Sequence, residues 1–190
     1  LMEVNGRYDG SSKFPESQQY AFFPSVSAGW RISQEPFWNV SKNTISDLKI
    51  RASYGSLGNG NVGSYNFMEL LNISTSGYVI NGALNKYTKC PAVIPNSLTW
   101  ETSTSVDLGV DLSMFRNQLR FTGDYYIRKT TDMYTVGMTL PEVFGATSPK
   151  GNYADMTTNG WELAVTWKHK FSAGSKPFDY ELRATLHDYY

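Results

Sequence analysis

Several features that mark common classes of protein are scarce in this chain of 190 residues. A single cysteine, Cys90, excludes an internal disulfide bond, and its polar surroundings indicate a thiol in a loop. The 17 basic residues are matched by 17 acidic ones, so the charge balance gives no basic surface for nucleic acid. Mean hydropathy is -0.38, and no apolar run approaches the roughly 18 residues of a membrane-spanning helix.

Sequence signatures of catalysis and of metal binding are also missing. The chain has no serine-nucleophile elbow and no zinc-protease motif, and its two histidines, His169 and His187, lack ligand spacing with a cysteine or an acid. Residues 58–63 match the GxGxxG pattern, but a preceding strand with two basic residues argues against a dinucleotide site, as does the absence of acids from residues 70–100. We expect a glycine- and asparagine-rich turn there, no metal, no cofactor and no enzyme.

The chain does have a strict alternation of apolar and polar residues. In residues 48–55, for example, Leu48, Ile50, Ala52 and Tyr54 alternate with polar residues and Gly55. Over all such stretches, 14 of 28 positions on the polar face are charged and none of 30 on the apolar face, whereas chance would place about five on each. The pattern predicts antiparallel strands with one dry face and one wet face. The seven stretches are residues 2–8, 25–32, 48–55, 104–112, 119–128, 161–168 and 180–187.

Two kinds of protein place a dry face and a wet face on one sheet. A soluble antiparallel sheet packs its dry face on a core, whereas a transmembrane β-barrel turns that face to lipid and the wet face to a lumen. If the chain is part of a barrel, we expect these residues to face lipid: Ile50, Leu108, Val110, Phe121, Leu163, Val165 and Leu182. The residues expected to face the lumen are Lys49, Arg51, Asp107, Asp111, Arg120, Asp124 and Glu162.

Two further patterns favour the barrel. Aromatic residues make up 15% of the chain and gather near the ends of the apolar stripes, as in the girdles of outer-membrane barrels. Long connections (residues 9–24, 56–103 and 129–160) also alternate with shorter ones (33–47, 113–118 and 169–179), as outer loops alternate with periplasmic turns. We expect the tightest turn near residues 115–118, and we leave open an extra strand pair within residues 66–80. The aromatic residues in question are Tyr8, Trp30, Tyr54, Trp161, Trp167 and Tyr180.

Asp107 and Asp111 are the acids most open to a catalytic interpretation. Their separation along one strand is roughly 13 Å, which is too far for a carboxylate pair that shares one glycosidic bond. We expect instead solvated acids that face Arg120 and Arg128 on the next strand.

Several blocks resemble, in family order, the SusC/RagA-type TonB-dependent transporters. Residues 7–14 (RYDGSSKF) are similar to the family's RxDGSSRF, and residues 23–37 (FPSVSAGWRISQEPF) to FPSxSxGWRxSEExF, with Gln34 where Glu is usual. Residues 48–59 are similar to LKLRASYGxxGN, and residues 100–111 to WExTxxxxxGxD. Arg128–Met133 and Asn159–Glu162 match later landmarks of the family.

The resemblance implies a stretch of about seven to nine strands from the C-terminal half of a barrel of about 22 strands. It implies TonB-dependent import of an oligosaccharide or peptide across the bacterial outer membrane, with a SusD-like surface lipoprotein and the TonB complex as partners. Residues 1–190 would then be a partial barrel without the plug domain and the earlier strands. Two alternatives remain: a small complete barrel with a structural or adhesion role, and a soluble carbohydrate-binding β-sandwich with Trp30, Trp100 or Trp161 as a sugar platform.

Overall fold

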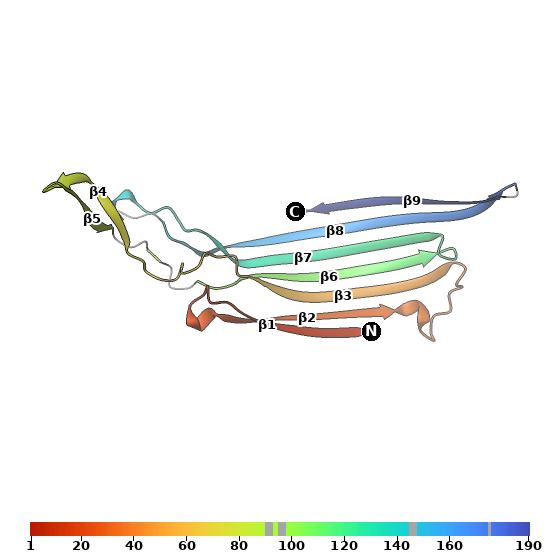
Figure 1. Ribbon diagram of the computed structural model, residues 1–190. Coiled ribbons are helices and arrows are strands. Elements are labelled where there is room, and N and C mark those ends of the chain that lie inside the picture. The colour runs from red at the N-terminus through yellow and green to blue at the C-terminus, as the bar shows by residue number, and fades with distance from the viewer. Residues whose placement is uncertain (90–92, 95–97, 145–147, 175) are drawn as a thin grey trace.

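The computed structural model describes residues 1–89, 93–94, 98–144, 148–174 and 176–190. Cys90 lies outside the described residues, so its place in a loop stays a prediction. Seven long strands lie side by side in one antiparallel sheet, in the order β1-β2-β3-β6-β7-β8-β9 (Figure 1). Their bounds are β1 (Met2–Gly10), β2 (Tyr20–Arg31), β3 (Ile45–Asn59), β6 (Glu101–Met114), β7 (Leu119–Val136), β8 (Lys150–Ala173) and β9 (Lys176–Tyr189).

The seven stretches predicted from alternation correspond one to one with these strands, which confirms the all-β antiparallel fold. Only Ile32 falls outside, because it begins a short 3-10 helix, η2 (Ile32–Gln34). The strands are longer than their apolar stripes, and β8 alone runs for 24 residues. Backbone pairing requires no apolar face, so polar residues continue the ladder beyond the stripe.

The connections alternate between the two ends of the sheet, but their lengths separate the ends less cleanly than the sequence predicts. Residues 11–19, 60–100 and 137–149 connect strands at one end, on the left of Figure 1, and residues 32–44, 115–118 and 174–175 connect them at the other. We call these the long-loop end and the short-turn end. The connection 11–19 is shorter than 32–44 because β1 and β2 extend into the predicted loop. The connections at the long-loop end contain η1 (Glu16–Gln18) and η3 (Glu142–Phe144).

The longest connection contains the strand pair that the sequence left open. β4 (Asn72–Ile80) and β5 (Ala83–Lys89) form a separate two-stranded hairpin that projects beyond the main sheet (Figure 1). Asn81 and Gly82 have positive φ values of 53° and 77°, which is the conformation required by a two-residue hairpin turn. The pair therefore begins later than the predicted residue 66 and ends later than residue 80.

The turn predicted near residues 115–118 lies between β6 and β7, but it is not the tightest at this end, because β8 ends at Ala173 and β9 already begins at Lys176. Phe115, Arg116 and Asn117 all have positive φ, at 53°, 58° and 66°. Contacts with the start of β3 and the connection before it hold this turn in place: Arg116 Nε donates to Asn43 Oδ1 at 2.9 Å, and the Asn117 amide donates to Ser46 Oγ at 3.1 Å. These contacts support the strained backbone of the turn.

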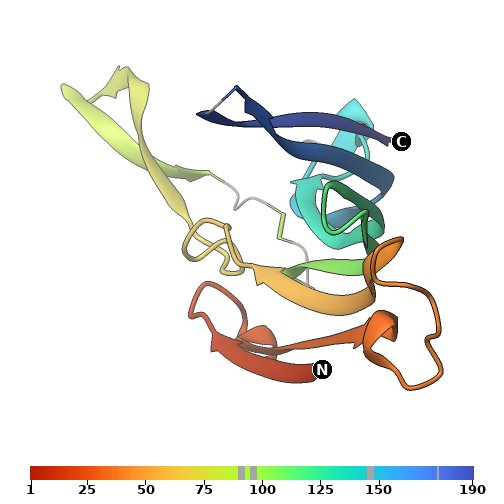
Figure 2. The same ribbon diagram turned by 90° about the vertical axis from the view of Figure 1, so that its right-hand side faces the viewer.

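The sheet is a single curved layer, as Figure 2 shows when it is viewed from the short-turn end. Within the described ranges, no second sheet and no long helix packs against either face. The described residues also include no helix of the length and apolar character needed to cross a membrane. The buried hydrophobic residues form one cluster at the long-loop end, which we call the loop core: Phe14, Phe23, Val62, Leu98 and Trp100.

Candidate functional site on the wet face of the sheet

The strand register brings the charged residues predicted for the wet face into common rows. Across the sheet, Arg51 is opposite Gly109, Gly109 is opposite Asp124, and Asp124 is opposite Glu162. Because side chains alternate between faces, residues in register and of matching parity share one side of the sheet. All seven residues predicted for the lumen are on this side, and the seven predicted for lipid are on the other.

Arg51 links three strands through two carboxylates. Its Nε donates to Asp111 Oδ2 at 2.8 Å, and its Nη2 donates to Asp124 Oδ1 at 2.8 Å. The three side chains are only 36%, 34% and 28% exposed, so solvent screens these ion pairs less than surface pairs. We call Arg51, Asp111 and Asp124 the inner charge network. A cation that is shared by two acids has little capacity left for a ligand.

Gly109 makes the inner charge network possible. It lies between Arg51 and Asp124 in register, on the strand that separates them. A Cβ at this position would overlap the Asp124 carboxylate and would lie 2.8 Å from Arg51 Cζ. The missing side chain therefore opens the space through which the guanidinium reaches across β6 to β7.

The other predicted lumen residues lie along the same face. Lys49 is opposite Asp111, and Asp107 accepts a hydrogen bond from Ser53 Oγ at 3.1 Å. Glu162 is opposite His187 as well as Asp124. Among the described residues, no group of three or more histidine, cysteine or acidic side chains could hold a metal ion.

One sequence prediction about these acids is wrong. Asp107 and Asp111 do not face Arg120 and Arg128, because the register places those bases opposite Ser113 and Ser105. The acids instead bond to β3, the preceding strand in the sheet. Sequence order suggested the neighbour on the other side, and only the pairing of β3 with β6 across 60 residues of chain decides it.

The dry face is uncovered within the described chain. Ile50, Leu108 and Leu182 are 41%, 55% and 64% exposed, which is unusual for large apolar side chains that lie together. Phe121 and Leu163 are half-buried because they close over Gly123, where a Cβ would lie 3.2 Å and 3.3 Å from their side chains. This face lacks the protein layer that a soluble sandwich requires.

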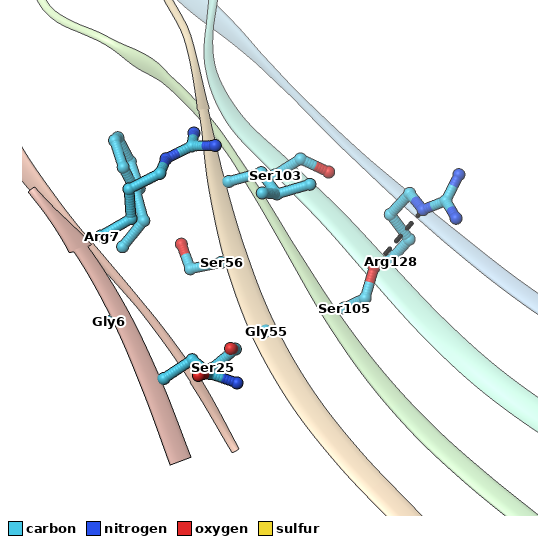
Figure 3. A pocket seen from close by; sticks show the side chains of 11 residues that line it. Gly6, Arg7, Ser25, Gly55, Ser56, Ser103, Ser105 and Arg128 are labelled. Carbon is cyan, nitrogen blue, oxygen red and sulfur yellow. Dashed lines mark hydrogen bonds between the residues drawn. The ribbon is translucent and has the colours of Figure 1, made fainter. Parts of the chain in front are cut away.

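A second feature of the wet face lies nearer the long-loop end, and sequence reasoning missed it. It is a hollow of about 670 Å³, which we call the outer hollow (Figure 3). The pairing of β2 with β3 stops at Ser25 and Gly55, whereas β3 stays paired with β6 as far as Asn59. The opening between these strands produces the hollow. Its lining residues are Asn5, Gly6, Arg7, Phe23, Ser25, Gly55, Ser56, Leu57, Ser103, Ser105 and Arg128.

A row of small residues gives the outer hollow its floor. Ser25, Gly55 and Ser105 are in register across three strands, and Asn5 and Arg128 end the row on either side. Figure 3 shows Arg7 and Arg128 at opposite sides, with the serines between them. The sequence does show serine and glycine at wet-face positions of neighbouring strands. Only the strand register shows that these small residues lie side by side.

The loop core closes the long-loop end beside the outer hollow and joins several connections. The Phe14 and Trp100 rings lie 4.7 Å apart, and Trp100 Nε1 donates to the Gln18 carbonyl at 3.0 Å. Asn152 accepts from the Thr99 amide at 3.0 Å and donates to the Thr99 carbonyl at 3.0 Å. Trp100 is 9% exposed, so the proposed role of Trp100 as a sugar platform is wrong.

Gly58 and Gly60, two of the three glycines in residues 58–63, pack against this core. A Cβ at Gly58 would overlap the Phe23 ring, and one at Gly60 would lie 3.0 Å from Trp100 and 3.3 Å from Phe14. Neither glycine has positive φ. Close packing of aromatic rings, rather than a left-handed turn, explains these two glycines, which the sequence assigned to a turn.

Comparison with known proteins places the sheet in a family. Residues 2–189 match the family described as TonB dependent receptor-like, beta-barrel. The chain is 38% identical over 166 residues to TonB-dependent receptor P3 of Formosa agariphila, covering 87% of this chain and 16% of that protein. It is 29% identical over 178 residues to TonB-dependent receptor SusC of Bacteroides thetaiotaomicron, covering 88% of this chain and 17% of SusC.

Solved structures agree with the sequence relatives. The RagAB peptide importer in its "closed-closed" state matches 98% of this chain at 26% identity, with a TM-score of 0.72. Its "open-open" state matches 96% at 25% identity, with a TM-score of 0.73, and the chain covers 20% of each of those chains. The chain thus spans about a sixth to a fifth of the length of these relatives, and it belongs to the TonB-dependent receptor family as part of the β-barrel.

Proposed function

We propose that the chain is part of the wall of an active importer in the bacterial outer membrane, with TonB supplying the energy. The observation that carries this proposal is the single-layer sheet with its charges on one face and exposed apolar side chains on the other. In a family of β-barrels, such a sheet suits lipid on one side and a lumen on the other. Its role is to hold a solute path and not to catalyse a reaction.

The dry face would contact lipid over the apolar stripes, and the wet face would line the lumen. Lipid offers no hydrogen bonds, so a spanning sheet needs every backbone group paired, as in these continuous ladders. Aromatic side chains gather on the dry face near the short-turn end, where the Phe171 and Phe178 rings lie 5.1 Å apart and Trp167 Nε1 donates to Tyr180 OH at 3.3 Å. Such residues suit a membrane interface.

The long-loop end would lie outside the cell, where a SusD-like surface lipoprotein would cover the barrel. Likeness to SusC and to the RagAB importer supports a partner of this kind. The projecting hairpin β4–β5 exposes Tyr78, Val79 and Leu84, which gives a surface for contact beyond the sheet. The TonB complex would act through a plug domain in another part of the protein.

The sheet would remain rigid during transport. It matches two states of RagAB about equally well, with TM-scores of 0.72 and 0.73, as expected if the wall keeps one shape in both. The inner charge network ties β3, β6 and β7 together, which favours one sheet geometry. Movement would be confined to the plug and the lid.

The imported solute would be an oligosaccharide or a peptide. RagAB is a peptide importer, whereas the names of the relatives P3 and SusC specify no substrate. The soluble sandwich has no support, because no second sheet covers the dry face among the described residues. A small complete barrel is disfavoured because β1 and β9 are the two edges of the sheet and do not pair with each other.

Spin labels in the full-length protein test the orientation. Single cysteines at Leu108, Phe121 and Val165, in a Cys90→Ser background, should give nitroxides accessible to oxygen and shielded from water-soluble relaxants. Matched labels at Thr122 and Thr166 on the wet face should show the reverse. Water accessibility at all three dry-face sites would overturn the orientation.

Uptake of solute by cells with and without TonB tests the source of energy. Uptake that persists without TonB would overturn the energised mechanism.

A further inference from the structure

The charge of the outer hollow sets it apart from the rest of the wet face. It is lined by two bases and no acid, whereas the hollow between β7, β8 and β9 mixes Arg120, Lys168 and Arg183 with Asp124, Glu162 and Glu181. Some wet-face cations elsewhere form salt bridges, as Arg51 does with two carboxylates and Lys168 does with Glu181. A concave surface whose lining includes basic residues and no acid favours an anionic ligand.

Arg128 supplies most of this unbalanced charge. Its Nε lies 3.4 Å from Ser105 Oγ, and its Cζ lies 6.0 Å from the centre of the Tyr126 ring. Among the described residues, no acidic side chain forms a salt bridge with Arg128, which is exposed to solvent. The ring and the serine orient the guanidinium while its terminal nitrogens stay available to a ligand.

Arg7 lies on the opposite side of the hollow, and a neighbouring acid partly neutralises its charge. Its Nε lies 2.7 Å from Asp9 Oδ2, and its Cζ lies 5.9 Å from the centre of the Phe23 ring. Phe23 is itself 5% exposed and fixed in the loop core, so Arg7 rests on a rigid neighbour. Arg7 can add a second, weaker contact to an anion.

The surface between the two bases combines apolar and hydroxyl groups. Phe23 and Leu57 contribute apolar area, and serines contribute donors and acceptors. β1 and β7 are separated by four strand spacings, which is ~19 Å between backbones before the side chains lean inward. A surface of this length accommodates several units of an extended oligomer, with hydroxyl or amide groups on the serines.

We infer that the outer hollow is a binding subsite for a carboxylate- or sulfate-bearing unit of the imported oligomer, with Arg128 as its main ligand. The inference rests on the proposed function, because the hollow meets a solute only if the wet face lines the import path. The anionic group can come from an acidic sugar or from an acidic side chain of a peptide. A carboxylate presents a flat pair of oxygens and a sulfate ester presents pairs of its terminal oxygens, and a guanidinium binds either through two hydrogen bonds.

Binding to the purified full-length transporter, measured by calorimetry, tests the inference. The probes are matched pairs: an oligogalacturonate and its methyl ester, and a glutamate-rich peptide and its glutamine counterpart. We expect wild-type protein to prefer at least one acidic member over its neutral partner. Arg128→Gln should weaken binding of that acidic probe by about tenfold to a hundredfold and leave its neutral partner unchanged.

Two variants control for charge and for shape. Arg120→Gln removes a base from the same face of the same strand but outside the hollow, so it should leave acidic binding unchanged. Ser105→Leu keeps Arg128 and fills the floor, so it should weaken binding of the acidic probe. Equal losses from Arg120→Gln and Arg128→Gln would show a general field effect and would overturn the assignment of a subsite.

The outcomes also separate this inference from the proposed function. Discrimination within the sugar pair, the peptide pair or both supports the subsite and identifies the source of the anion. If neutral probes are bound and imported in a TonB-dependent manner without any acidic preference, the inference fails and the importer stands. If no solute is imported with TonB present, the proposed function fails.

Discussion

Arg51 and Arg128 lie on the same face of the same sheet but have opposite surroundings. Arg51 donates to two carboxylates at 2.8 Å each and is about two-thirds buried, whereas Arg128 has one hydroxyl contact at 3.4 Å and is exposed. The difference arises from what lies opposite each base: Gly109 leaves room for Asp124, and Ser105 offers only a hydroxyl. The same residue type therefore stabilises the wall in one place and is available to a ligand in the other.

The largest effect should follow from closing the space that Arg51 uses. Gly109→Val places a side chain where the Asp124 carboxylate and the Arg51 guanidinium lie, and should destabilise the full-length protein by about 3 kcal/mol. Denaturant unfolding in lipid vesicles measures this loss.

Gly29 provides the control for the Gly109 substitution. It is opposite Arg51 on the other side, but the nearest atom to a Cβ there is the flexible Lys49 Cε at 3.2 Å. Gly29→Val should therefore cost less than about 1 kcal/mol. Equal losses at the two glycines would show that Gly109 matters for the strand and not for the ion pairs.

The next largest effect should come from disturbing the loop core beside the outer hollow. Gly58→Ala forces the Phe23 ring to move and should cost about 2 kcal/mol. Because Phe23 supports Arg7 and packs with Trp100, the long connections should become more sensitive to protease. Gly77→Ala is the control, since a Cβ there meets no atom within 4 Å. Unchanged protease resistance in Gly58→Ala would argue against a rigid loop core.

Removal of the two arginines compares the two regions directly. Arg51→Gln leaves Asp111 and Asp124 without their cation and should destabilise the protein by about 1–2 kcal/mol, a value reduced by partial exposure. Arg128→Gln should change the stability by less than about 0.5 kcal/mol. Urea unfolding of the two variants measures both. A larger loss for Arg128 than for Arg51 would reverse the assignment of roles.

The smallest effect should be that of salt on the two regions. The binding of an acidic probe at the exposed Arg128 should weaken as ionic strength rises, because a Debye length of about 8 Å at 0.15 M shortens the reach of its field. The unfolding free energy contributed by the inner charge network should change less, since its members are partly buried. Titration of calorimetric binding with sodium chloride checks the first effect. Salt-independent binding of the acidic probe would contradict an electrostatic subsite.

Much of this architecture could be predicted from the sequence. Strand positions and the division of residues between the faces follow from the period of two, because a shift by one residue would move charges such as Lys49 and Asp111 onto the apolar face. Connection lengths were a weaker guide, because residues 11–19 form a shorter connection than residues 32–44 at the opposite end of the sheet. The predicted strand ends were less accurate than the predicted strand positions, because β7 and β8 continue beyond the apolar stripe with polar residues on both faces.

The sequence by itself therefore determined the strands and their two faces, because alternation is a local property of the chain, and its family-like blocks indicated the family. Only the tertiary structure decided that Arg51 reaches Asp124, 73 residues away, that Trp100 is buried in the loop core and that Ser25, Gly55 and Ser105 form one floor. These relations depend on which strands pair and in which register, and long-range backbone pairing sets both. A side chain's partner across a sheet is fixed by that pairing and not by its neighbours along the chain.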